Sequence, residues 1–308
     1  MSDTLTAVLP GADPAGGGPV FDETAIPPRW RIVFSRFRRQ RLAMFGLLAL
    51  VTLFVMAFVG PHLTQWAYTE HDFNAFLQGP SAEHWFGTTQ TGGDVFALAM
   101  RGMQKSLIIG LLVAVVSTSL SAFVGAFAGY FGGWVDRVLM WFVDLLLVLP
   151  SFLIIAILSP TFRGKTWLIF VVLLAAFLWM ITARIVRGMT ISLREREYVL
   201  AARYMGVSRP KIILRHVLPN ISSLLIIDAT INVSAAIISE TGLSYFGFGI
   251  QSPDVSLGTL IADGTKSATT YEWLFAFPAG LLVLIVLAVN LMGDGLRDAL
   301  DPTSQASS

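Results

Sequence analysis

Residues 194–219, which read REREYVLAARYMGVSRPKIILRHVLP, are the most charged internal stretch of a very apolar chain. The i, i+3, i+4 and i+7 positions of one helix face are occupied by Tyr198, Ala201, Ala202 and Met205. Gly206 follows where a helix commonly ends on a residue with positive φ. Ser208 can cap a second helix, with Pro210 in its first turn. The pattern predicts a helix, a sharp turn and a second short helix; a plain basic loop between two membrane spans is the alternative.

The composition is that of a polytopic membrane protein. Of the 308 residues, 55% are hydrophobic and 13% are charged, whereas a soluble domain carries about 25% charged residues. The mean hydropathy is +0.69, and the net charge of +1 gives no reason to expect nucleic-acid binding. The absence of cysteine excludes disulfides, thiolate metal sites and a cysteine nucleophile, and the four histidines lack metal-ligand spacing.

The charged stretch resembles the coupling loop of the membrane subunits of binding-protein-dependent ABC importers. That family's pattern is Glu-Ala-Ala, three residues, Gly, nine residues, Ile, any residue, Leu-Pro. The matching positions here hold Ala201, Ala202, Gly206, Leu218 and Pro219. Two positions depart from the pattern, because Leu200 replaces the Glu and His216 replaces the Ile. Glu197 lies one helical turn before Leu200 and could offer a carboxylate nearby.

Other segments resemble the second membrane subunit of dipeptide, oligopeptide and nickel importers. Gly87, Thr88, Gly92 and Asp94 match a motif that precedes the transport core of that family. The segment ETGLSYFGFG, which begins at Glu240, and the C-terminal GDGLRDALDP are similar to two further family signatures. The resemblance covers roughly residues 84–302.

The resemblance implies an all-α permease with six transmembrane helices in a bacterial cell membrane. Its partners would be a homologous permease, two ATPase subunits and an extracytoplasmic binding protein. ATP and Mg would bind to the ATPase subunits, so we expect no cofactor, metal or catalytic residue in this chain. The residues implied in ATPase coupling are Glu197, Tyr198, Leu200, Ala201, Ala202, Met205, Gly206, Leu218 and Pro219. Peptides are the expected cargo, with nickel or another small solute as the alternative.

One short sequence is similar to part of a nucleotide site. Gly164-Lys165-Thr166 matches the end of a phosphate-binding loop, but Ser159 stands where the first Gly of that loop is required. We therefore interpret it as a basic loop and predict that the chain is not itself an ATPase.

Hydrophobic runs give the domain organisation. We predict a disordered cytoplasmic tail (1–28), an amphipathic helix on the inner membrane surface (29–41), a first transmembrane helix (42–60), an extracytoplasmic loop (61–105), a permease core of five helices (106–297) and a cytoplasmic tail (298–308). The core would contain a cytoplasmic coupling loop (188–217) and an extracytoplasmic loop (240–273). Its spans are expected at 106–131, 138–158, 167–183, 217–239 and 274–293, with a kink at Pro150 and an interruption at Pro278.

Basic residues predict that both termini lie in the cytoplasm. With six spans and this orientation, all but five of the 21 lysines and arginines fall on the inner side. The same orientation places the charged stretch in the cytoplasm, where an ATPase subunit could reach it.

Four polar residues lie within the hydrophobic spans or at their ends: Asp144, Asp228, Asn232 and Glu240. A carboxylate at the centre of a membrane helix costs about 2.5–3.5 kcal/mol on insertion scales, so it should face protein or a water-filled cavity. We expect these residues either to lie near the translocation path or to form hydrogen bonds between packed helices. Asp144 and Asp228 also allow a different class of function, an ion-coupled secondary transporter that needs no ATPase. An intramembrane aspartyl protease is disfavoured because the flanking motifs are absent.

Overall fold

The computed structural model describes residues 29–162, 167–251 and 254–300, and within these ranges it is helical without any named strand. Four helices are long: α2 (Arg41–Val59), α3 (Val95–Phe131), α10 (Leu218–Tyr245) and α12 (Trp273–Leu300). The shorter elements are α1 (Arg29–Arg39), η1 (Gly60–His62), α4 (Gly133–Val148), α5 (Ser151–Leu158), η2 (Ser159–Phe162), α6 (Leu168–Leu178), α7 (Met180–Arg194), α8 (Glu197–Tyr204), α9 (Arg209–Ile212), η3 (Ile213–Val217) and α11 (Leu257–Thr265). The predicted tail 1–28 and the Gly164-Lys165-Thr166 loop lie outside the described residues.

The described helices include four that are long and apolar enough to cross a membrane: Arg41–His62, Val95–Phe131, Arg209–Tyr245 and Trp273–Leu300. Two further pairs pass the same test only together. Helices α4 and α5 are bent by 78° at Leu149-Pro150, and α6 and α7 by 47° at Trp179. The fold thus has four spans, or up to six if each bent pair crosses as one.

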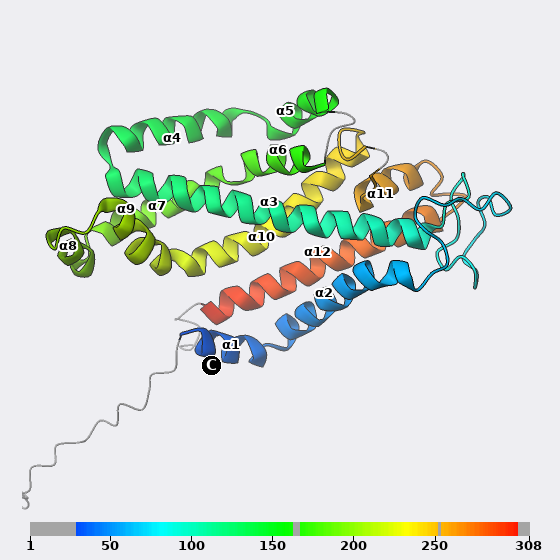
Figure 1. Ribbon diagram of the computed structural model, residues 1–308, viewed down its shortest axis with the longest axis horizontal. Helices are drawn as coiled ribbons and strands as arrows, with labels where there is room; N and C mark the ends of the chain where they lie inside the picture. Colours follow the sequence, from blue (N-terminus) through cyan, green and yellow to red (C-terminus); the bar gives the residue numbers. More distant parts are fainter. Residues whose placement is uncertain (1–28, 163–166, 252–253, 301–308) are drawn as a thin grey trace, which may run out of the picture.

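The helices run roughly along the long axis of the molecule, with α3 through the middle (Figure 1). Helices α4 and α5 lie on one side of α3, and α2 and α12 lie on the other. Helix α8 protrudes at one end, whereas the loop after α2 and helix α11 lie at the opposite end. Helix α1 packs through Val33 and Phe37 on the C-terminal end of α12, where it meets Leu296 and Ala299.

Helices α3 and α7 pack closely because α3 carries Gly125 and Gly129 on one face. A Cβ added at Gly125 would lie 2.4 Å from the Ala183 carbonyl oxygen, and one at Gly129 would lie 2.6 Å from the Arg187 carbonyl oxygen. The spacing is that of the Gly-x-x-x-Gly motif, in which small residues let membrane helices approach backbone to backbone. The small residues of the span predicted at 106–131 therefore let α3 and α7 pack closely.

Helix α3 begins at Val95, eleven residues before the predicted start of this span at residue 106. Asp94 caps it by accepting a hydrogen bond from the Ala97 amide at 2.7 Å. The predicted extracytoplasmic loop (61–105) included Arg101 and Lys105, which lie in α3. Both charges have partners from distant parts of the chain: Arg101 lies over the Tyr68 ring, and Lys105 pairs with Asp254 at 2.8 Å.

The other helix ends also extend beyond the predicted spans. Helix α7 continues to Arg194, so it contains the first residues of the predicted coupling loop 188–217. Helix α10 continues to Tyr245 and includes Glu240, the predicted first residue of the outer loop. Hydropathy alone does not mark the ends of a helix that continues beyond its apolar run.

Two prolines have different effects on their helices. Pro150 lies at the break between α4 and α5, in agreement with the predicted kink. The predicted interruption at Pro278 is wrong, because α12 continues through this residue. Pro278 is the sixth residue of α12, so it removes one hydrogen bond, the one that an N–H here would donate to the Leu274 carbonyl, and the helix continues despite this loss.

Candidate functional site

Helix α8 is a short, exposed helix that lies between α7 and the membrane-length run from α9 to α10. Only Glu195 and Arg196 separate it from α7, and the Arg196 amide donates to the Leu193 carbonyl at 3.1 Å. Beneath it, Val199 and Ala202 are buried against Ile212 of α9. These contacts tie α8 to both neighbouring helices, so its displacement would be transmitted to α7 and to α10.

The outer face of α8 is apolar and unusually exposed. Tyr204 is 85% exposed and Met205 is 76% exposed, and Tyr198 and Ala201 are also exposed. Of the four residues predicted to share a face, only Ala202 is therefore buried. Large apolar side chains that are exposed on a polar segment are typical of a surface that a partner protein covers.

The turn after α8 has the geometry that the sequence predicts. Gly206 has φ of +80°, and its amide donates to the Arg203 carbonyl at 3.0 Å. The Val207 amide reaches back to the Ala202 carbonyl at 3.1 Å, which completes a helix-ending turn of the Schellman type. No atom lies within 4 Å of a Cβ placed on Gly206, so backbone conformation alone requires glycine here.

The short helix predicted after Gly206 corresponds to α9, and it differs from the prediction in two respects. Ser208 occupies the cap position and Pro210 the first turn, as predicted, but the Ser208 side chain makes no capping hydrogen bond. The predicted short helix is not separate, because α9 continues through the π-helical turn η3 into α10. Pro219 lies in the first turn of α10 and has no N–H for the preceding carbonyls, and a π turn is one way in which a helix accommodates this loss.

The remaining predicted coupling residues lie around α8 and at the start of α10. Glu197 is exposed in the first turn of α8, and Leu200 is half-buried. Leu218 packs with Ile213 of η3 and Ile221 of α10 in the cluster that joins α10 to α7. Pro219 itself is exposed. The structure also places Tyr130 of α3 beneath α8, a contact between distant parts of the chain that no local pattern indicates.

Asp228 of α10 is the centre of a hydrogen-bond network that joins three helices. Its carboxylate accepts from the Thr118 hydroxyl of α3 at 2.7 Å and from the Thr182 hydroxyl of α7 at 2.5 Å. Asn232, one turn further along α10, donates its amide to the same carboxylate at 3.0 Å. The predicted residues Asp228 and Asn232 are thus brought together, in the helix-joining arrangement that was one of the two expectations for them.

Two ion pairs connect α4 with α7. Asp136 pairs with Arg187, and Asp144 pairs with Arg184. In the Asp144–Arg184 pair both side chains are more than half exposed, at 56% and 52%. Charges at such a position avoid lipid, so this side of the pair faces another protein chain or water.

Glu240 is fully buried near the end of α10, where it joins α10 to α11. Its Oε1 accepts hydrogen bonds from the hydroxyls of Ser244 and Ser256, both at 2.6 Å. Ser256 also caps α11 by accepting from the Thr259 amide. Glu240 therefore positions the segment that follows α10, and it does not contact Asp144 or Asp228 in any described interaction.

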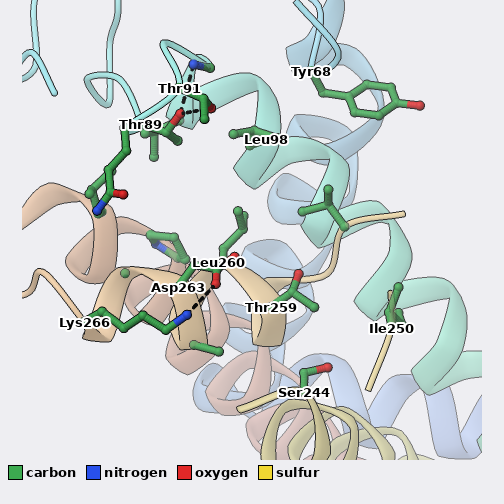
Figure 2. A pocket seen from close by; sticks show the side chains of 18 of the residues that line it. Tyr68, Thr89, Thr91, Leu98, Ser244, Ile250, Thr259, Leu260, Asp263 and Lys266 are labelled. Carbon is green, nitrogen blue, oxygen red and sulfur yellow. Dashed lines mark hydrogen bonds and ion pairs between the residues drawn. The ribbon is translucent and has the colours of Figure 1, made fainter. Parts of the chain in front are cut away.

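A cavity of about 570 Å³ opens at the end of the molecule opposite α8. Its walls come from the loop after α2, from α3 and from the segment between α10 and α12 (Figure 2). Polar side chains such as Thr89, Asp263 and Lys266 line it together with Leu98 and Leu260. A mixed lining of this kind suits a polar, partly apolar ligand or protein segment.

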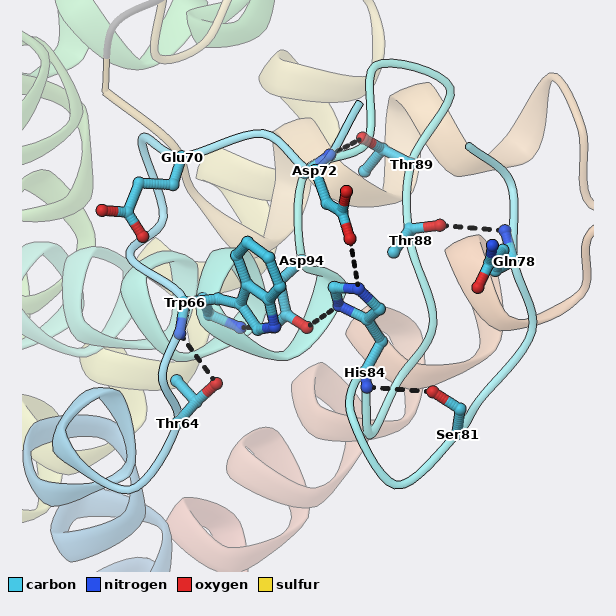
Figure 3. A network of polar contacts seen from close by, with 12 residues as sticks. Thr64, Trp66, Glu70, Asp72, Gln78, Ser81, His84, Thr88, Thr89 and Asp94 are labelled. Atoms are coloured by element: carbon cyan, nitrogen blue, oxygen red, sulfur yellow. Dashed lines mark hydrogen bonds and ion pairs between the residues drawn. The ribbon is translucent and has the colours of Figure 1, made fainter. Parts of the chain in front are cut away.

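The loop that forms one wall of this cavity is held by a buried histidine. The His84 ring lies between the carboxylates of Asp94, at 2.9 Å, and Asp72, at 3.5 Å, and the Trp66 indole stacks on it (Figure 3). Because Asp94 also caps α3, the network fastens the loop to the start of that helix. Among the described residues, no group of three or more His, Asp or Glu side chains could hold a metal ion.

Comparisons with known proteins identify the family to which the chain belongs. The family model of the binding-protein-dependent transport system inner membrane component matches residues 121–305, which include α8, its turn and α10. The chain belongs to this family. A second model, the N-terminal transmembrane domain of oligopeptide transport permease C, matches residues 28–80. As a member of the family, the chain is the membrane component of a binding-protein-dependent importer and not its ATPase subunit.

Relatives of this inner membrane component match it over nearly its full length. The oligopeptide transport system permease protein OppC of Mycobacterium bovis is 59% identical over 284 residues, which cover 92% of this chain and 98% of that protein. The same protein of Mycobacterium tuberculosis strain H37Rv gives identical values. The dipeptide transport system permease protein DppC of Alkalihalophilus pseudofirmus is 35% identical over 94% of this chain and 95% of its own length. These matches favour the importer over the ion-coupled alternative.

Proposed function

We propose that this membrane component forms the translocation path for oligopeptides, including dipeptides, and that α8 couples this path to a separate ATPase. The observation that carries the proposal is a helix with large exposed apolar side chains, held between α7 and the membrane-length run from α9 to α10. The names of the relatives support peptides as cargo. Nickel or another small solute is the alternative cargo for the same machinery.

The proposed topology has six spans with both termini in the cytoplasm. It counts each bent pair, α4 with α5 and α6 with α7, as one crossing. The contact of α1 with the C-terminal end of α12 supports termini on one side, and the distribution of basic residues supports the side that α8 occupies. Residues 29–41 then lie at the inner surface, and the loop after α2 and helix α11 lie outside.

The proposed assembly contains a homologous permease, two ATPase subunits and an extracytoplasmic binding protein. A second permease would account for the exposed Asp144–Arg184 pair, since either a protein partner or a water-filled path between two permeases keeps these charges from lipid. The binding protein would dock at the end opposite α8, where the 570 Å³ cavity opens. ATP and Mg would be bound by the ATPase subunits, with no nucleotide site in this chain.

The proposed mechanism is alternating access. When ATP closes the ATPase dimer, the ATPase displaces α8, and α8 moves α7 and α10 together because both are fixed to it. The Asp228 network attaches α3 to the same group, and the Asp136–Arg187 pair attaches α4. The helices would move as one body and open the path outward, and hydrolysis would reverse the motion. ATP shifts this equilibrium only by its different affinity for the two states.

The experiment is uptake of labelled peptides into proteoliposomes that contain the full complex. Uptake that requires ATP and the ATPase subunits supports the proposal, and peptides of increasing length, with nickel as the competing solute, determine the cargo. Uptake by this chain alone in response to an ion gradient would overturn it in favour of a secondary transporter.

A further inference from the structure

A small polar cavity of about 270 Å³ lies beside α8, at the end of the molecule where α8 protrudes. It is bounded by the last residues of α3, by the α7–α8 junction, and by α8 and α9. Three arginines line it, Arg194, Arg203 and Arg209, and among the described residues Glu195 is the only acidic one in its wall. The cavity therefore has an excess of two positive charges.

The three guanidinium groups differ in what already contacts them. Arg194 donates to Glu195 at 2.9 Å and to the Gly129 carbonyl at 3.2 Å. Arg209 lies over the Phe131 ring, with its guanidinium carbon 5.7 Å from the ring centre, and among the described residues its N–H groups have no hydrogen-bond acceptor. Arg203 has no hydrogen bond or ion pair within the described part of the chain. Two cations with free donors thus face one cavity.

Leu200 forms part of the same wall, and it replaces the Glu of the family pattern. A carboxylate at this position would supply a negative charge to the cavity from within the chain. With leucine there, the described wall of the cavity offers Arg203 and Arg209 no carboxylate, since Glu195 is paired with Arg194, and an anion from outside the chain could bind them. The exposed Tyr204 and Met205 follow directly on α8, so the cavity is continuous with the surface that we assign to the ATPase.

We propose that this cavity binds an Asp or Glu side chain of the ATPase subunit, held between Arg203 and Arg209. The inference rests on the proposed function of α8 and adds the chemistry of its contact: the permease supplies the cations and the ATPase supplies the anion. Arginine suits this role, because its planar N–H fork binds a carboxylate through two parallel hydrogen bonds. Such a pair, once covered by the partner, contributes more to the association than an exposed pair does.

The test uses the full complex, purified in zwitterionic lipid, with Arg203→Glu and Arg209→Glu variants. Matched controls are Lys211→Glu and Arg215→Glu, which reverse exposed charges of the same segment outside the cavity wall. We expect each cavity variant to weaken ATPase co-isolation at least about tenfold and each control less than about twofold. The thermal stability of the isolated permease should be equal in all four variants, which shows that they fold.

Salt provides a second measurement. ATPase association with the unaltered permease should weaken as ionic strength rises, and an Arg203→Gln variant should show a smaller dependence on salt. Equal losses in cavity variants and controls would overturn the inference while leaving the proposed function intact. Normal ATPase binding, with loss of binding only to vesicles that contain anionic lipid, would assign the cavity to a lipid headgroup and also overturn it. If the unaltered permease failed to bind the ATPase, the proposed function itself would fail.

Discussion

Gly206 determines the angle between α8 and the segment that returns to the membrane. Its φ of +80° is in a region that costs other residues about 1–2 kcal/mol, and β-branched residues suffer most. Gly206→Val should therefore loosen or redirect the turn without affecting the membrane helices. We expect insertion and ATPase binding to persist, while peptide uptake per ATP hydrolysed falls several-fold in proteoliposomes.

The control for this variant is Gly188→Val on α7. Gly188 is exposed, no atom lies within 4 Å of an added Cβ, and its backbone has no positive φ. Uptake should be close to that of the unaltered protein. Normal uptake in Gly206→Val as well would count strongly against a rigid α8.

Asp228 offers a different test at the residue scale. Replacement by Ala leaves the Thr118, Thr182 and Asn232 donors without their shared acceptor, at a cost of about 1–2 kcal/mol. Unfolding in a denaturing detergent should show this loss, and Asp228→Asn should show a smaller one because one acceptor oxygen remains. If Asp228→Asn kept full stability and abolished uptake, the charge itself would act in transport and the network would not be merely structural.

The local sequence predicts the conformation of some residues but not the contact partners of others. The conformation of Gly206 follows from a local pattern, because the residue type and the end of a helical repeat coincide at that position. The partners of Asp228 lie 110 and 46 residues away, so local spacing does not indicate them. The cavity arginines are visible as charges in the sequence, but Phe131, which completes the wall, comes from the end of α3.

At the scale of elements, the close contact between α3 and α7 holds the two helices together, so we expect them to move as one body. Gly129→Leu would place a side chain against the Arg187 backbone carbonyl, where it has no space. Overpacking of this kind costs about 1–3 kcal/mol, and more when backbone must shift. We expect lower thermal stability and loss of uptake, whereas Gly280→Leu on α12, with no neighbour within 4 Å of an added Cβ, should be tolerated. Equal stability of the two variants would contradict the observed packing.

The Asp136–Arg187 pair between α4 and α7 gives a second prediction for elements. Asp136→Arg places two like charges together and should reduce ATP-driven uptake, because α4 loses its attachment to the moving group. The exchanged pair Asp136→Arg with Arg187→Asp should recover much of the loss, with a coupling energy of about 0.5–3 kcal/mol in a double-mutant cycle of stability. Additive effects of the two substitutions would show that the pair is not what joins these helices.

Hydropathy predicts the positions of the spans but not all of their ends. Helix α3 begins before the predicted span, and this extension contains the buried Lys105, which pairs with Asp254 and lies over the Trp167 ring, contacts that exist only in the folded chain. The break between α6 and α7 at Trp179 contains neither proline nor glycine, so no turn residue indicates it. In contrast, the break at Pro150 follows from the residue type alone.

At the scale of the whole molecule, the account requires that α8 reach the cytoplasm and that the opposite end reach the exterior. The chain contains no cysteine, so each introduced cysteine is a single label without background. The segment between α11 and α12 lies at the end opposite α8 (Figure 1), and its exposed Thr269 provides the matched control site. A Thr269→Cys variant should react with a membrane-impermeant thiol reagent that is added outside intact cells.

The most direct measurement is the labelling of a Met205→Cys variant, because Met205 is 76% exposed beside the Gly206 turn. The account predicts no reaction from outside intact cells, reaction in inside-out vesicles, and protection in those vesicles when the ATPase subunits are bound. Reaction of Met205→Cys from the cell exterior, or equal reaction with and without bound ATPase, would contradict the claim that α8 is the helix through which the ATPase moves the permease.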